Sequence, residues 1–143
     1  MGTRSVFTFK DDDETYSVYK HWDGYPEGAA EFLTKAIPFA WELPRFEASD
    51  FAAAFIAANK LSGGGDVSLT INHEAHGDLD YFYEVFASDR NGQLIIRVYE
   101  VGHNLEEIFY GRLKDFVNKY GDNSTKTMWN TYDKSENKLS VEA

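Results

Sequence analysis

Five segments rich in β-forming residues constrain the fold of this chain most. Alternation of apolar and polar side chains is the period of a strand with one buried face. Segments 4–10 and 15–21 both alternate, and the acidic run 11–14 between them predicts a hairpin with a charged turn. The other three segments are 66–72, 81–88 and 93–101, and the last two flank a predicted Asn-Gly turn at 89–92.

Two helices are predicted between the second and third strands. The first follows Pro26, because proline is tolerated in the first turn of a helix. An irregular apolar connector, 39–46, separates it from the second helix, which Ser49 or Asp50 can cap. The glycines at 63–65 are expected to end this second helix, because glycine tolerates the backbone of a helix C-terminus.

The C-terminal third is predicted to contain one more helix and a tail. Apolar residues recur at helical spacing from Leu105 to Tyr120, but Gly111 lies within the run and lowers its helix propensity. The stretch Glu106 to Tyr110 is therefore either helix or strand, and we favour a short strand that enters the helix. We expect one α+β domain over 1–121, an antiparallel sheet of about four to five strands with helices mainly on one face. Residues 122–143 are predicted to be a polar, partly mobile tail.

Composition excludes several classes of protein. The chain of 143 residues has no cysteine, which rules out disulfides, thiolate metal sites and a cysteine nucleophile. Its 14 basic and 24 acidic side chains give a net charge of −10, which opposes binding to nucleic-acid phosphates. No apolar run approaches the length of a membrane span, and no export signal is recognised, so we expect a cytoplasmic protein.

The densest motif is His-Trp-Asp-Gly-Tyr-Pro at 21–26. In the structural interpretation, Trp22 and Tyr25 face inward at a strand-to-helix corner. Asp23 caps exposed backbone N–H groups there, and Gly24 and Pro26 set the backbone angles. In the functional interpretation, His21, Trp22, Asp23 and Tyr25 line a small cleft that binds a polar ligand, with the imidazole as a pH-sensitive donor or base. We favour the structural interpretation.

Residues 19–28, Tyr-Lys-His-Trp-Asp-Gly-Tyr-Pro-Glu-Gly, resemble the N-terminal motif of a family of small bacterial and phage proteins. In that family an early strand leads into the motif and then into a helix. The likeness covers the first third of the chain and extends more loosely to 109–120. The family has no established activity, so the resemblance implies a shared architecture and no catalytic residue.

His73 and His76 form the most metal-like pair, with Asp78 and Asp80 close behind. Two imidazoles face one side of a helix at a separation of four, but here the separation is three and Gly77 disfavours a helix. A polar loop is the preferred interpretation, and no cofactor is expected.

Our leading hypothesis is an acidic binding module without catalytic chemistry, of bacterial or phage origin. Its partner would be another protein or a second copy, and the alanine-rich helix at 52–58 either packs within the chain or forms a dimer seam. In one variant an acidic face occupies the nucleic-acid groove of a host protein. The alternative is a small hydrolase-like or ligand-processing enzyme that uses His21 and Asp23, assisted by Glu27 or His103.

Overall fold

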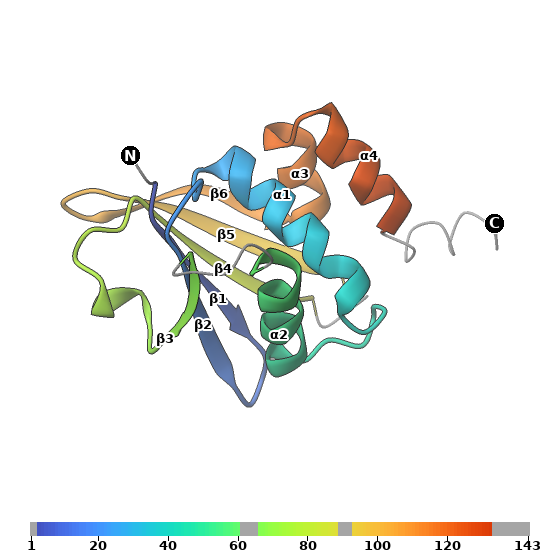
Figure 1. Cartoon of the computed structure of the whole chain (residues 1–143), viewed down its shortest axis with the longest axis horizontal. Helices are drawn as coiled ribbons and strands as arrows, with labels where there is room; N and C mark the ends of the chain where they lie inside the picture. Colours follow the sequence, from blue (N-terminus) through green and yellow to red (C-terminus); the bar gives the residue numbers. More distant parts are fainter. Residues whose placement is uncertain (1–2, 61–65, 89–92, 133–143) are drawn as a thin grey trace.

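Six strands form one mixed β-sheet, in the order β3-β2-β1-β4-β5-β6 (Figure 1). The computed structural model describes residues 3–60, 66–88 and 93–132. The strands are β1 (Ser5–Lys10), β2 (Thr15–Lys20), β3 (Val67–Thr70), β4 (Tyr81–Ala87), β5 (Leu94–Val101) and β6 (Leu105–Arg112).

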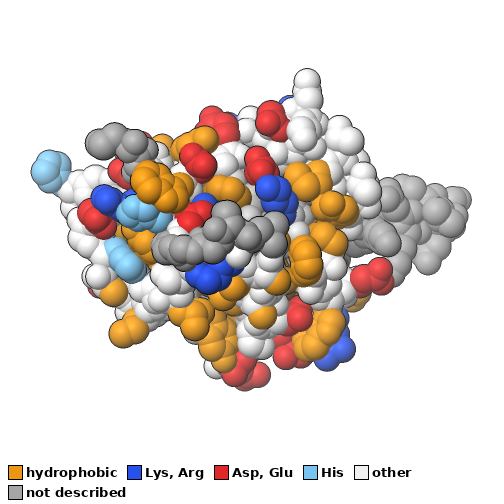
Figure 2. Space-filling view, in the orientation of Figure 1, with side chains coloured by type: hydrophobic (Ala, Val, Ile, Leu, Met, Phe, Trp, Pro, Cys, Tyr) orange, Lys and Arg blue, Asp and Glu red, His pale blue; other side chains and the backbone are white. Residues whose placement is uncertain are grey.

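Four α-helices lie together on one face of this sheet (Figure 1). They are α1 (Pro26–Ala36), α2 (Ala48–Asn59), α3 (Leu113–Tyr120) and α4 (Asn123–Tyr132). Two short 3₁₀ turns, η1 (Ile37–Phe39) and η2 (His73–Ala75), lie in the connections. Acidic, basic and hydrophobic side chains are interspersed over the helical face (Figure 2). The α+β class is confirmed.

The sheet differs from the prediction in size and in the direction of one central pair. It has six strands, and β1 runs parallel to β4 while every other neighbouring pair is antiparallel. The chain places β2 and β3 on one side of β1, and then crosses to the other side to begin β4. Alternation reports only which face of a strand is buried, so it does not distinguish the two pairing directions.

In the C-terminal third, the predicted strand at 106–110 is confirmed and the predicted end of the domain is wrong. Residues 106–110 lie within β6, so the preference for a short strand before the helix was right. The segment after Gly121 is not a free tail, because α4 follows it and buries Thr125 and Trp129. The domain therefore extends to Tyr132. The predicted turn at 89–92, the glycines at 63–65 and residues 133–143 lie outside the described residues.

The core fills the space between the sheet and the helices with aromatic side chains. Phe7 in β1 stacks on Tyr83 in β4, with ring centroids 4.6 Å apart. Its ring also lies 4.6 Å from that of Phe55, which α2 contributes. Offset and tilted aromatic pairs of this kind stabilise a core beyond the apolar area that they bury. The buried alanines of α2 let this helix lie close, so its alanine face packs within the chain.

One carboxylate, that of Asp11, holds the acidic turn between β1 and β2 in place and joins it to α2. Asp11 accepts hydrogen bonds from the backbone N–H groups of Asp13 and Glu14, both at 2.8 Å. Its other oxygen accepts from the N–H of Ala48 at 2.7 Å, where α2 begins. These bonds, that of Ala48 first, lower the pKa of the Asp11 carboxyl below its ordinary value of 3.8.

Asp11 should make the stability of the protein depend on pH. Because its pKa is lower in the folded state, the ionised carboxylate stabilises the fold above pH 3.8, and this contribution is lost as the pH falls through the folded pKa. We expect Asp11→Asn to lower the urea midpoint at pH 6 and the difference from wild type to shrink below pH 3.8. The matched control is Asp12→Asn, in the same exposed turn. An equal effect of both substitutions at every pH would contradict this assignment.

Candidate functional site

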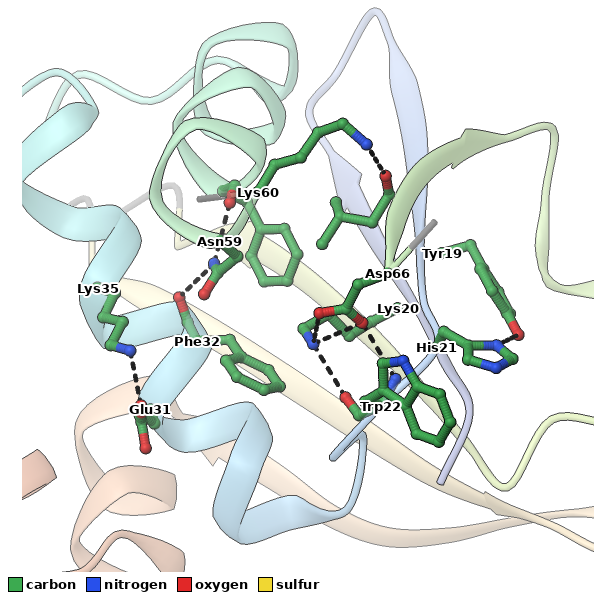
Figure 3. Close-up of polar contacts among 12 residues, drawn as sticks. Tyr19, Lys20, His21, Trp22, Glu31, Phe32, Lys35, Asn59, Lys60 and Asp66 are labelled. Carbon is green, nitrogen blue, oxygen red and sulfur yellow. Dashed lines mark hydrogen bonds and ion pairs between the residues drawn. The ribbon is translucent and has the colours of Figure 1, made fainter. Parts of the chain in front are cut away.

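An ion pair between a buried lysine and a half-buried aspartate holds the corner between β2 and α1 (Figure 3). Lys20 is the last residue of β2, and its Nζ lies 2.7 and 2.9 Å from the two carboxylate oxygens of Asp66. The same Nζ donates to the carbonyl of Trp22 at 3.0 Å and lies 4.2 Å from the ring centroid of Phe32 in α1. A buried ammonium is tolerated only with such compensation, because removing it from water is costly.

Asp66 also fixes the backbone that follows β2. Its carboxylate accepts the N–H of Trp22 at 3.2 Å, and its backbone carbonyl accepts the N–H of His21 at 2.8 Å. Phe32 also contacts the second helix. Its backbone carbonyl accepts a hydrogen bond from the side-chain amide of Asn59, at the end of α2 (Figure 3). The start of β3, the corner and both long helices are thus connected through one polar network.

The bend itself requires an unusual backbone at Asp23 and two glycines. Asp23 has a φ of 59°, a left-handed conformation that aspartate adopts more readily than most residues. A Cβ at Gly28 would meet the carbonyl oxygen of Asp23, so α1 can start this close to the bend only with glycine there. Gly24 donates to the carbonyl of Thr3 at 2.9 Å. Its own carbonyl accepts from the hydroxyl of Tyr83 at 2.6 Å, and burial raises the pKa of that hydroxyl well above its usual value.

The two aromatic residues of the motif do not face inward, which corrects the structural interpretation. Trp22 is 46% exposed and Tyr25 is 39% exposed. The bend is held by the Lys20–Asp66 pair and by the hydroxyl of Tyr83 instead. Asp23 was expected to cap backbone N–H groups with its side chain, but it contributes its backbone conformation, and its side chain is exposed.

The His21 imidazole belongs to an aromatic cluster with Tyr19 and His76. Its Nδ1 lies 2.8 Å from the hydroxyl of Tyr19, and its ring meets the ring of Trp22 edge-on at 4.5 Å. The imidazole of His76 stacks on the ring of Tyr19, with centroids 4.6 Å apart, and its Nε2 lies 2.7 Å from the hydroxyl of Thr70. Burial raises the pKa of Tyr19, so this phenol stays neutral.

The proposed catalytic pair is not assembled as a catalytic pair requires. A general base of this type needs a carboxylate bonded to the imidazole, which fixes its tautomer. In the part of the chain that the structure describes, His21 is bonded to Tyr19, and neither Asp23 nor Glu27 is bonded to it. His103 lies exposed in the turn between β5 and β6.

The histidines of the 71–80 connection pack against the sheet. His73, in η2, stacks on Phe82 of β4 at 4.0 Å, as His76 stacks on Tyr19 of β2. Tyr19 and Phe82 belong to one cross-strand row, since both pair with Val6 of β1. Among the described residues, no three histidine or carboxylate side chains converge to hold a metal ion.

A separate apolar pocket of about 370 Å³ lies beside the connector between α1 and α2. Its walls come from the connector, the first turn of α2, the first residue of β5 and the end of α4. The apolar wall residues are Ile37, Pro38, Ala40, Trp41, Leu43, Phe46, Phe51 and Leu94. Ligand pockets have this size and this mainly apolar lining, with few polar groups.

Trp41 and Arg45 form the polar rim of this pocket. The Arg45 guanidinium carbon lies 3.4 Å from the centroid of the Trp41 ring, a close cation–π contact. The backbone N–H of Trp41 donates to the carboxylate of Asp50 in α2 at 2.9 Å, which fixes the connector to the helix. Trp41, which lines the pocket, is 40% exposed, so its aromatic ring also reaches solvent.

Comparison of the chain with family models, curated proteins and solved structures finds no match. The resemblance of 19–28 to the bacterial and phage family therefore stays a prediction. Within the described residues, no helix is both long enough and apolar enough to cross a membrane. Evidence for function comes from the geometry of the corner and of the pocket.

Sequence reasoning missed both the ion pair and the pocket. Lys20 does carry a signal, because it shares a strand face with Val18, which is buried, and a lysine on an apolar face needs a counter-charge. Asp66 is 46 residues away, so its identity as the partner has no local signal. The pocket forms from four distant elements, and only the aromatic, non-periodic composition of 39–46 hinted at it.

The Lys20–Asp66 pair should show strong thermodynamic coupling. We expect Asp66→Asn to destabilise the fold by about 3 kcal/mol, because it leaves the buried ammonium without a counter-charge. The double variant Lys20→Met with Asp66→Asn should recover at least about half of that loss, since it removes the uncompensated charge. Urea unfolding of wild type, both single variants and the double variant measures this coupling. Simple additivity of the two single effects would show that the pair is not the stabilising unit.

The stability of the fold should depend on the backbone conformation of Asp23 and little on its charge. Asparagine also adopts the left-handed conformation, so Asp23→Asn should change stability by less than about 0.5 kcal/mol. Asp23→Ala should cost about 1 kcal/mol, because alanine pays a steric penalty at this φ. Thermal or urea unfolding compares the two variants. Equal destabilisation by both would instead assign the role of Asp23 to its carboxylate charge.

Proposed function

We propose that this protein is a small acidic binding module whose pocket accepts an apolar side chain of a protein partner. The observation that carries the proposal is the pocket of about 370 Å³, with the part-exposed ring of Trp41 in its wall. Exposed aromatic residues next to an apolar recess are typical of binding surfaces, because they bury a large area on contact.

The composition of the rim supports a protein partner. Tryptophan and arginine are the residues that most often dominate the energy of protein interfaces, and here Arg45 stacks on Trp41. The stacked pair is held in place before any partner arrives, because Asp50 bonds the backbone of Trp41. Preorganisation of this kind reduces the entropy lost on binding.

Charge around the pocket favours a basic partner segment. Glu42 and Asp50 line the pocket, and Glu47 lies 3.9 Å from Arg45 just outside it. Three carboxylates against one guanidinium leave the rim negative, in a chain whose net charge is −10. An apolar side chain flanked by lysine or arginine would complement both the walls and the rim.

The hydrolase alternative has less support. Its two residues, His21 and Asp23, lie at the corner and do not line the pocket. The imidazole is bonded to a tyrosine hydroxyl, which is a weaker orienting group for a base than a carboxylate. The binding proposal needs neither residue.

Capped peptides test the proposal directly. We would titrate the protein with a hexapeptide that has Leu-Phe at its centre and lysine at both ends, and with its glutamate-ended counterpart, and follow binding by NMR of the tryptophan indole N–H signals. The lysine peptide should bind at least about threefold more tightly, and the difference should shrink at high salt, which screens rim charges.

Two alanine substitutions locate the binding. Ala40 lines the pocket, so Ala40→Trp should fill it and weaken peptide binding at least about tenfold. Ala53, exposed on α2 and absent from the pocket walls, provides the matched control, and Ala53→Trp should bind like wild type. Binding that survives Ala40→Trp unchanged, or a wild type that binds neither peptide, would refute the proposal.

A further inference from the structure

The outer edge of β3 pairs with no other strand among the described residues. In that part of the chain β3 pairs only with β2, and it is the terminal strand of the sheet. The carbonyl of Asp66 accepts from the N–H of His21, so the backbone groups of Asp66, Ser68 and Thr70 point toward β2. By alternation, the N–H and C=O groups of Val67 and Leu69 point away from the sheet.

This edge is apolar and uncharged. Leu69 is 72% exposed and Ile71 is 87% exposed, and hydrophobic side chains reach the surface on this side of the molecule (Figure 2). Residues 67–72 read Val-Ser-Leu-Thr-Ile-Asn, without one charged side chain. Natural edge strands are usually protected by lysine, proline or a bulge against pairing with another strand. No lysine, proline or bulge occurs within 67–72, and the protection that remains is the short length of β3, which has four residues.

Among the described residues, Lys60 contacts the first residue of this edge. Lys60, after the end of α2, donates from its Nζ to the carbonyl of Val67 at 2.6 Å (Figure 3). A carbonyl oxygen has two lone pairs, so this contact still permits a second hydrogen bond. The backbone of Leu69 lies beyond the reach of this contact, at the centre of the free edge.

We propose that two copies of this chain associate through their β3 strands, which pair antiparallel about a two-fold axis at Leu69. Leu69 then lies opposite the partner's Leu69, and Val67 lies opposite the partner's Ile71. The two six-stranded sheets become one continuous sheet of twelve strands. An interface of this kind is closed by its symmetry, because the same patch serves both copies.

The side-chain pattern of the edge is self-complementary in this register. Val67 and Leu69 pair with Lys20 and Val18 of β2, so they lie on the helical face of the sheet. Paired about Leu69, the two strands therefore place only apolar side chains together on that face. On the opposite face each Ser68 meets the partner's Thr70, which allows hydroxyl hydrogen bonds.

Charge also favours a second copy at this edge. Two molecules with a net charge of −10 repel, but residues 67–72 contribute no carboxylate, and the charged group beside them is the Lys60 ammonium on the Val67 carbonyl. The nearest carboxylate, Asp66, is already neutralised by Lys20. The alanine face of α2 is no alternative seam, because most of its alanines are buried against the core.

A single cysteine tests the register, because the chain has none of its own. In the proposed dimer the two Leu69 positions form a hydrogen-bonded pair with Cα atoms about 5.5 Å apart, which a disulfide can span. Leu69→Cys should therefore form a disulfide-linked dimer under mild oxidation. Ile71→Cys is the matched control, since it is at least as exposed, but its two Cα atoms would be roughly 13 Å apart. Equal cross-linking of both variants would overturn the register.

Sedimentation of the full chain tests the association itself. The wild type should shift from 16.3 kDa toward twice that mass as its concentration rises into the range of about 10 to 500 µM, because a short strand pair forms a weak dimer. Leu69→Lys should remain a monomer, since it places two like charges at the axis. Leu105→Lys, at an exposed position on the opposite edge strand, should dimerise like wild type. A wild type that stays monomeric throughout, or a Leu69→Lys variant that dimerises equally well, would overturn the proposal.

Discussion

The ion pair between Lys20 and Asp66 is the interaction on which the arrangement of the N-terminal half depends. Lysine is among the residues least often buried, and its ammonium is stable in this position only because a carboxylate, a carbonyl and an aromatic ring surround it. These partners come from the residue before β3, from the corner and from α1, so the charge is satisfied only when all three are in place. The pair therefore couples the end of β2 to elements that local sequence does not connect.

The same interaction explains why the aromatic residues of the corner reach the surface. The Lys20 side chain lies against Phe32 and occupies the space beneath the corner. The stacked rings of Phe7 and Tyr83 fill the neighbouring core. Trp22 can then bury only part of its ring, while its backbone serves the ion pair through both its N–H and its carbonyl. The motif is conspicuous in the sequence because its backbone geometry is demanding, as the positive φ of Asp23 and the close approach at Gly28 show.

A feature of this fold could be predicted from the sequence where it depends on residues that are close together in the chain. Alternation and helix signals act over a few residues, and they placed the strands around 4–21, 81–88 and 93–101 and the helix that follows Pro26. The parallel pairing of β1 with β4, the Lys20–Asp66 pair and the pocket walls join residues tens of positions apart, for which one sequence carries no local signal. Burial of α4 was missed for a related reason. Its sequence is mostly polar, and Trp129 with Thr125 suffices to fix it to the rest of the domain.

Net charge determines where an acidic protein of this size can make contacts. Carboxylates are spread over the face shown in Figure 2, so another chain approaches most easily where apolar side chains are exposed or where it brings basic side chains of its own. The β3 edge presents apolar side chains, whereas the pocket combines apolar walls with a negative rim, and the two draw on different elements. β3 ends the sheet, whereas β5, which contributes Leu94 to the pocket, is the fourth strand from it. With strands about 4.8 Å apart, β5 lies roughly 19 Å from β3 across the sheet. No residue of β3 lines the pocket, so pairing through β3 covers none of the pocket walls directly. A dimer that presents two equal pockets would bind a partner with two basic apolar segments more tightly than either pocket alone, provided that the linker between those segments spans the two sites.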